Sequence, residues 1–182
     1  MSGTIGVIGA GAWGTALAQS LASDGSRVLL WAREADLVTE INTRRTNSVY
    51  LPSASLAESI TATNALDDLS GIGVLLVVVP AQFLASALAV LSGPTFAHEV
   101  AAGLPTAVTL ACSGGEEQWT RLAPDIARPG LRPYYSDDVV GAEIGGAVKN
   151  VLAIACGVVE GLGLGQNARA AVIARGDAEM LR

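Results

Sequence analysis

Three glycines near the start of the chain have the spacing of a turn that binds a dinucleotide. Gly9, Gly11 and Gly14 form the pattern GxGxxG in the stretch GAGAWG, directly after an apolar run typical of a buried strand. The first glycine would permit a tight turn, the second would let the backbone approach a pyrophosphate, and the third would let the next helix pack on the strand. Because N–H groups at a helix N-terminus bind phosphate, this context predicts a dinucleotide site; a turn with only a structural role is the alternative.

The end of the second apolar strand indicates which dinucleotide would bind. An Asp or Glu at this place would bind the ribose 2′-hydroxyl of NAD, but the stretch RVLLWAR ends with Arg33. An arginine can pair with a 2′-phosphate and stack on adenine, so NADP is favoured. NAD stays open because Glu34 is the next residue, and Arg33 could also be a solvent-exposed cation at a strand end.

Lys149 is the only lysine in the chain and lies in the apolar stretch EIGGAVKNVLAIACG. Burial disfavours the charged form of an amine and lowers its pKa, so a buried lysine could exchange a proton with a carbonyl substrate. On a helix, Gly145 lies one turn earlier on the same stripe and leaves room for the lysine or a ligand. The alternative is a structural lysine whose long stem reaches water at a domain edge.

The composition limits the partners and the location of the protein. The chain has 182 residues, a net charge of −6 and scattered basic residues, which argue against nucleic acid as a partner. Cys112 and Cys156 show no metal-ligand spacing, so no metal site is predicted and both are interpreted as small packing residues. The longest aliphatic run, VLLVVV, is too short to span a membrane, and no basic leader precedes the first strand. We therefore expect a cytoplasmic protein without a membrane span.

The elements that would position these residues alternate between strand and helix through residues 1–137. Apolar runs predict strands at 4–11, 27–33, 73–80, 106–112 and 131–138, and a strand, a turn and a helix within 89–103. Helical spacing predicts helices at 12–25, 34–45, 81–88 and 115–127. This alternation predicts an α/β fold with an open parallel sheet. After Asp138 the strand signals stop, and we expect a closely packed helix at 140–162 and another from 167 onward.

Three stretches together resemble the bacterial NAD(P)-dependent glycerol-3-phosphate dehydrogenases: GAGAWGTALA, SGPTFAHEVAAGLPTAV and the long run from YYSDD to GDAEM. The resemblance implies a Rossmann-type dinucleotide-binding domain at 1–137 and the start of an all-helical substrate domain at 138–182. It implies interconversion of sn-glycerol 3-phosphate and dihydroxyacetone phosphate with NADP or NAD, which supplies glycerophospholipid synthesis. The partner would be a small phosphorylated substrate, and a homodimer is one option.

The resemblance also assigns roles to individual residues. Lys149 would transfer the proton and contact substrate, and His98 is given no chemistry. Gly93 and Thr95 would bind substrate. The cofactor would contact the glycine turn and further residues, with Arg33 at its adenosine end: Gly9, Gly11, Ala12, Trp13, Gly14, Arg33, Tyr50 and Ala97.

The sequence departs from the family in two places. One strand and helix, roughly 35 residues with a Cys-Ala-Lys-Gly motif that contacts substrate and cofactor, have no counterpart near the join at 88/89. The family's later aspartate and Ser-Arg-Asn segment have no counterpart before Arg182. A missing βα unit would leave unpaired backbone groups in a parallel sheet, which favours a protein longer than these 182 residues. The 182 residues alone are expected to be inactive.

Two other functions remain open from the sequence. One is another dehydrogenase of similar architecture, such as a hydroxyacid or ketopantoate-type reductase, but the pair SGPTF and GGAVKN argues against it. The other is a Rossmann module that binds a cofactor without catalysis.

Overall fold

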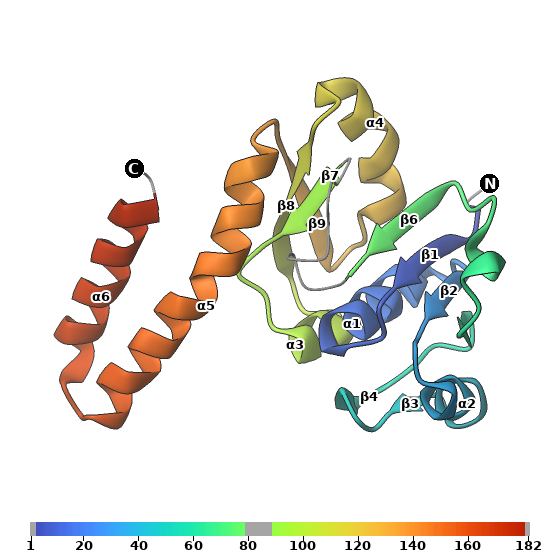
Figure 1. Cartoon of the computed structure of the whole chain (residues 1–182), viewed down its shortest axis with the longest axis horizontal. Coiled ribbons are helices and arrows are strands. Elements are labelled where there is room, and N and C mark those ends of the chain that lie inside the picture. Colours follow the sequence, from blue (N-terminus) through green and yellow to red (C-terminus); the bar gives the residue numbers. More distant parts are fainter. Residues whose placement is uncertain (1–2, 79–88, 181–182) are drawn as a thin grey trace.

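The structure is a computed structural model that describes residues 3–78 and 89–180 (Figure 1). Its N-terminal part is built on a parallel sheet of strands rich in Val, Leu and Ile. The strands are β1 (Ile5–Ile8), β2 (Val28–Trp31), β5 (Ile60–Thr63) and β6 (Val74–Val77), in the order β5-β2-β1-β6. Ile5 pairs with Val28 on one side and with Val74 on the other. The predicted α/β fold with a parallel sheet is therefore confirmed.

Two helices and several short elements surround this sheet. Helix α1 (Ala12–Leu21) follows β1, ends in a 3₁₀ turn η1 (Ala22–Asp24) and buries Leu17 and Leu21 completely. Helix α2 (Ala35–Arg44) follows β2 and buries Leu37 and Ile41. Both helices were predicted from their spacing, and their ends differ from the prediction by a few residues. The segment between α2 and β6 holds β3 (Thr46–Asn47), β4 (Leu51–Ser55), β5 and a 3₁₀ turn η2 (Leu66–Leu69).

A second sheet follows, with strands β7 (Ala89–Ser92), β8 (Thr106–Cys112) and β9 (Leu131–Ser136). Helix α3 (Ala97–Ala101) connects β7 to β8, and α4 (Gly115–Ile126) connects β8 to β9. Strands β8 and β9 are parallel, but β7 is antiparallel to β8, so the expectation of parallel strands is wrong for this pair. The reason is that α3 packs against α1 and does not cross the second sheet as the helix of a βαβ unit would.

The two sheets are not hydrogen-bonded to each other within the described residues, where β6 borders one sheet and β7 borders the other. They share a hydrophobic cluster in which Leu17 of α1 is buried together with side chains from both sheets, including Leu76 and Leu91. The helix predicted at 81–88 and the join predicted near 88/89 involve positions outside the described residues.

Two helices end the chain and extend away from the α/β part as a hairpin (Figure 1). They are α5 (Val139–Gly161) and α6 (Gly165–Met180), which confirms the predicted change to helices after Asp138. The expected close packing of α5 is wrong over most of its length, because its apolar side chains are exposed. The exposed residues of α5 include Val140, Ile144, Val151, Ile154 and Val158.

Helix α5 is also the one helix among the described residues that is long and apolar enough to cross a membrane. Length and composition are the only grounds for this, and a core helix of a soluble protein has the same two properties. The aliphatic run that begins in β6 is too short to cross a membrane. The composition of α5 alone is therefore a weak indication of a membrane span.

Candidate functional site

The glycine turn between β1 and α1 has the backbone that the sequence predicts. Gly9 has φ +111°, a conformation that favours glycine, and a Cβ there would collide with the carbonyl oxygen of Val78. A Cβ on Gly14 would collide with the carbonyl oxygen of Gly9, so this glycine lets α1 lie close to the turn. Gly11 differs from both, because a Cβ built on it meets no atom within 4 Å.

The open space at Gly11 lies where a dinucleotide phosphate is expected. Gly11 is the N-cap of α1 and has an extended backbone, with no side chain bonded to the cap. The first N–H groups of a helix have no partner inside the helix, and together with the helix dipole they attract an anion. Helix α1 begins at Ala12, and Trp13 follows. The open space at Gly11 and the free N–H groups at the start of α1 therefore suit a pyrophosphate.

Two buried polar residues that the sequence analysis did not single out hold the turn in place. Thr15 donates a hydrogen bond through Oγ1 to the carbonyl oxygen of Ala10, and Asn47 donates through Nδ2 to the same oxygen. The side-chain oxygen of Asn47 also accepts from the backbone N–H of Tyr50. Asn is common in turns because its side chain can bond the backbone a few residues later. This general preference was the one clue to Asn47 that the sequence offered.

Several predicted cofactor residues meet where α1, β4 and α3 pack together. Trp13 of α1 and Ala97 at the start of α3 both pack on a cluster formed by Ala16, Leu51 and Val100. Tyr50 directly precedes Leu51 and keeps 42% of its surface exposed. The structure therefore brings Trp13 and Ala97 together, with Tyr50 at the edge of the same region.

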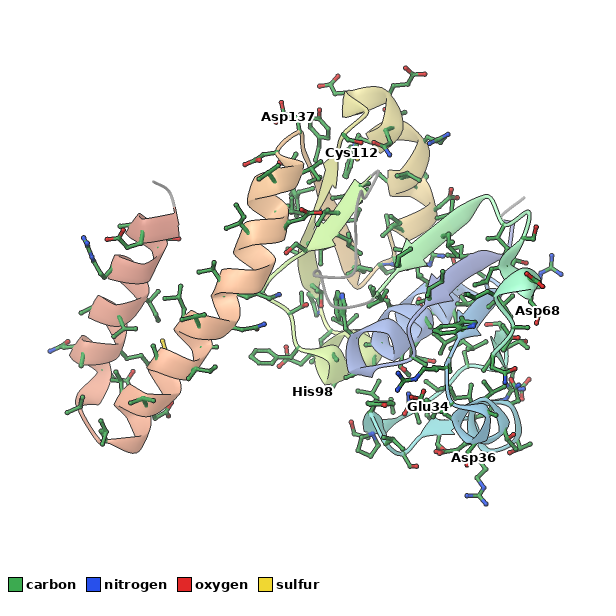
Figure 2. The ribbon with its side chains drawn as sticks, in the orientation of Figure 1. Glu34, Asp36, Asp68, His98, Cys112 and Asp137 are labelled. Carbon is green, nitrogen blue, oxygen red and sulfur yellow. The ribbon has the colours of Figure 1, made fainter. Side chains whose placement is uncertain are left out.

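Arg33 lies apart from this cluster, beyond the end of β2. Its guanidinium binds the carboxylate of Glu34, with Nη2 at 2.9 Å from Oε1, and its side chain is 82% exposed. Figure 2 labels Glu34, which precedes the first turn of α2. Arg33 is thus free to turn toward a ligand, but a 2′-phosphate would have to compete with Glu34 for it.

A second predicted group of residues surrounds a pocket of about 360 Å³ between β7, β9 and α5. Lys149 lies on α5 and donates through Nζ to the carbonyl oxygen of Gly93, at 2.7 Å. The lining residues are Ser92, Gly93, Pro94, Thr109, Ser136, Asp138, Ala142, Gly145 and Lys149. The structure therefore joins Lys149 and Gly93, which are 56 residues apart in the sequence.

The environment of Lys149 differs from the sequence-based expectation. The prediction of a buried lysine is wrong, because Lys149 is exposed. Helix α5 contacts the second sheet through its first turns. Among the described residues, only α6 covers another part of α5, so much of the helix surface stays exposed. Lys149 is therefore an exposed residue that lines the pocket.

Small residues bring α5 close to β7. A Cβ added to Gly146 would lie 3.2 Å from the Oγ of Ser92, so glycine permits this approach. Gly145 lines the pocket beside Lys149, as its predicted place on the same stripe requires. The carboxylate of Asp138 caps α5 by accepting from the N–H of Gly141 at 2.8 Å. Neither Ser92 nor Asp138 was identified from the sequence. They lie far apart in the chain, and only the packing of α5 on β7 brings both to the pocket.

One short segment connects the two regions of the site. Gly93 contacts Lys149, and four residues later Ala97 packs on the same buried cluster as Trp13. Thr95 lies between them and is half-buried, but it is not among the residues that line the pocket. The pocket and the glycine turn thus lie at the two ends of residues 93–97.

The remaining candidates from the sequence have no place in this arrangement. His98, labelled in Figure 2, is exposed on α3. The centre of its ring lies 6.0 Å from that of the Phe96 ring. Cys112 is buried in β8, and burial raises the pKa of its thiol, as expected of a packing residue. Among the residues that the structure describes, no group of three or more His, Cys, Asp or Glu side chains could hold a metal ion.

Family comparisons agree with this architecture. The model for the N-terminus of NAD-dependent glycerol-3-phosphate dehydrogenase matches residues 4–89 and 85–118, and the model for its C-terminus matches residues 138–182. Among solved structures, the glycerol-3-phosphate dehydrogenase of Coxiella burnetii has a TM-score of 0.87 and 38% identity. That match covers the whole chain and 68% of the Coxiella protein.

Curated relatives match over the entire chain. Proteins called glycerol-3-phosphate dehydrogenase (NAD(P)+) from Erythrobacter litoralis and Novosphingobium aromaticivorans are 60% and 61% identical, each with all of this chain aligned. The chain spans 66% of the length of each of these relatives. By the two family models and these relatives, the chain belongs to the NAD-dependent glycerol-3-phosphate dehydrogenase family.

Proposed function

We propose that this chain binds NADP(H) or NAD(H) at the glycine turn and that the interconversion of sn-glycerol 3-phosphate and dihydroxyacetone phosphate takes place beside Lys149. The observation that carries the proposal is the 2.7 Å hydrogen bond from Lys149 Nζ to the Gly93 carbonyl, at a pocket connected to the glycine turn by residues 93–97. The family's name supports the reaction, and the pocket supports the place. A ketone at this place would have an ammonium group within reach.

The residues of the pocket suit a small phosphorylated ketone. The residues of the glycine turn would hold the reduced cofactor, whose nicotinamide would supply the hydride that the carbonyl carbon needs. Lys149 donates a proton to the carbonyl oxygen as negative charge develops there, which completes the alcohol. In the opposite direction, neutral Lys149 accepts the hydroxyl proton. The pocket also offers hydroxyl groups that can bind phosphate or hydroxyl oxygens, from Ser92, Thr109 and Ser136. The Gly93 carbonyl orients Lys149 by accepting its hydrogen bond.

We also place a boundary between a dinucleotide-binding domain at 1–137 and a helical domain at 138–182. Strand β9 ends at Ser136, α5 begins at Val139, and the C-terminal family model begins at 138, all of which support this division. A homodimer and a cytoplasmic location remain part of the proposal. The exposed apolar side chains of α5 support association with another polypeptide, and light scattering of the purified chain tests for a dimer.

A specific observation favours a second function for the chain as it stands, namely cofactor binding without turnover. The alignment with the Erythrobacter protein runs over 220 residues although this chain has 182, and the N-terminal match is split at residues 85–89. Both observations support the loss of one βα unit near 88/89. The lysine of the Cys-Ala-Lys-Gly motif that the resemblance implies would be lost with it.

The purified 182-residue chain is expected to bind NAD(P)H and to show no oxidation of it that depends on dihydroxyacetone phosphate. A chimera that adds the extra segments of the Erythrobacter protein is expected to gain this activity. Fluorescence titration measures the binding, and loss of absorbance at the nicotinamide band measures turnover. Turnover by the unmodified chain would show that the added segments are not needed, and absence of binding would contradict the cofactor site.

Replacing Glu34 by glutamine is expected to strengthen NADPH binding and to leave NADH binding unchanged. The change removes the carboxylate that now binds the Arg33 guanidinium. Because exposed ion pairs contribute little, the gain in NADPH affinity should be about twofold to fivefold. The matched control is Arg33→Ala, which should weaken NADPH binding alone. If both variants bind the two cofactors as the wild type does, Arg33 does not recognise a 2′-phosphate.

A further inference from the structure

The side chain of Asn47 is fully buried, with 0% of its surface exposed, and every polar atom of it is bonded. Its Nδ2 donates to the carbonyl oxygen of Ala10 at 2.9 Å and to Oγ1 of Thr15 at 2.8 Å. Its Oδ1 accepts from the N–H of Tyr50 at 3.0 Å. Burying a side-chain amide costs free energy unless its polar atoms are hydrogen-bonded. These bonds therefore favour one arrangement of the segments that contain Ala10, Thr15 and Tyr50.

The bond to Ala10 fixes the direction of a peptide group inside the glycine turn. The Ala10 carbonyl also accepts from Thr15 Oγ1 at 3.2 Å, so two buried donors hold it toward the interior. The peptide bonds of the described residues are trans, so the Ala10 carbonyl and the N–H of Gly11 point in opposite directions. Holding the carbonyl inward therefore directs the Gly11 N–H outward, to the N-terminus of α1.

The bond to Tyr50 connects a second part of the candidate cofactor site to the first. Asn47 lies in β3 and Tyr50 directly precedes β4, whereas Ala10 and Thr15 belong to the glycine turn and α1. Leu51, next to Tyr50, packs with Ala16 of α1. One side chain thus sets the position of the β3–β4 turn relative to the turn that would bind the pyrophosphate.

We propose that Asn47 is a positioning residue for dinucleotide binding, acting through the carbonyl of Ala10 and the hydroxyl of Thr15. It touches neither reacting group and aligns the Gly11 N–H and the Tyr50 backbone before the cofactor arrives. Preorganised donors bind an anion without the cost of ordering them, so loss of this alignment weakens affinity. This inference rests on the proposed cofactor site and extends it to a residue outside the motif.

The decisive variant is Asn47→Asp, which keeps the shape and the acceptor for Tyr50 but replaces the donor to Ala10 by a second oxygen. We expect the dissociation constants of NADH and NADPH to rise at least about tenfold, because an unsatisfied buried polar group costs more than one ordinary hydrogen bond. The matched control is Asn42→Asp. Asn42 donates to the carbonyl of Ala62 at 2.9 Å and accepts from its N–H at 2.8 Å, away from the glycine turn.

Thermal unfolding without cofactor separates stability from positioning. Asn42→Asp should lower the melting temperature but change each dissociation constant by less than about twofold, since it leaves the cofactor site intact. If Asn47→Asp binds both cofactors no more weakly than Asn42→Asp does, the role of Asn47 is purely structural and the inference is overturned.

A second pair of variants decides the matter if Asn47→Asp does not fold. Thr15→Ser keeps the hydroxyl that joins Asn47 to Ala10, whereas Thr15→Val keeps the shape and removes it. Thr15→Ser should bind NADH as the wild type does, and Thr15→Val should bind it about fivefold more weakly, as expected for one lost hydrogen bond. Equal binding by the two variants overturns the inference. A wild-type chain that binds neither cofactor overturns the proposed function itself, and the role of Asn47 with it.

Discussion

Replacing Gly11 by valine is expected to abolish most NAD(P)H binding while the protein still folds. Gly11 has φ −67°, which any residue adopts, and a Cβ there meets no protein atom within 4 Å. The valine side chain would instead occupy the space in which a pyrophosphate approaches the N-terminus of α1. Hydrogen bonds to a charged group contribute about 1.5–3 kcal/mol each, so losing two of them weakens binding by about 10²–10⁴-fold.

Fluorescence titration with NADH and NADPH measures this loss, and circular dichroism with thermal unfolding checks the fold. The control is Gly14→Val, three residues later on the same turn. Its side chain would collide with the carbonyl oxygen of Gly9, so this variant should lose the fold and the binding together. A folded Gly11→Val protein with wild-type affinity would mean that the turn has only a structural role.

Replacing Lys149 by methionine is expected to reduce the rate of dihydroxyacetone phosphate reduction by about 10²–10⁴-fold, the range typical of a lost general acid. The variant keeps the apolar stem but has no ammonium to donate a proton or to bind the Gly93 carbonyl. Cofactor affinity should be unchanged, because among the residues that the structure describes the side chain of Lys149 bonds to Gly93 and not to the glycine turn. Stability should stay close to that of the wild type, since Lys149 is exposed and replacing it empties no core.

The rate is measured in the chimera completed with the segments of the Erythrobacter protein, where turnover is expected. Lys149→Arg is the matched variant, because it keeps the charge but stays protonated and has a planar head. It should not restore the rate. Near-normal turnover by Lys149→Met would remove Lys149 from the chemistry and leave it as a residue that orients the loop at Gly93.

Local patterns predicted most of the secondary structure. Strand β8 was predicted at 106–112 and lies at Thr106–Cys112, and the helix predicted at 140–162 lies at Val139–Gly161. These segments are long or strongly apolar, so their periodicity is a reliable signal. The glycine turn was also predictable, because the φ of Gly9 and the close approach at Gly14 depend on neighbours only a few residues away.

The direction of β7 was not predictable in the same way. Its sequence is apolar whichever way its neighbour runs, and the antiparallel pairing with β8 depends on where α3 packs. The exposure of Lys149 has a similar origin. An apolar helix predicts burial only if other segments cover it, and α5 keeps much of its apolar surface uncovered in this chain.

By itself, the sequence determined that a strand, a glycine turn and a helix follow one another, and that Lys149 is the sole ammonium side chain available for chemistry. Only the tertiary structure decided that Lys149 meets Gly93 at a pocket and that Asn47 holds the carbonyl of Ala10. The physical reason is the range of the interactions. Backbone conformation and helical periodicity are set by residues within a few positions of each other. A hydrogen bond between residues 37 or 56 positions apart forms only when the packing of whole elements brings a donor to its acceptor.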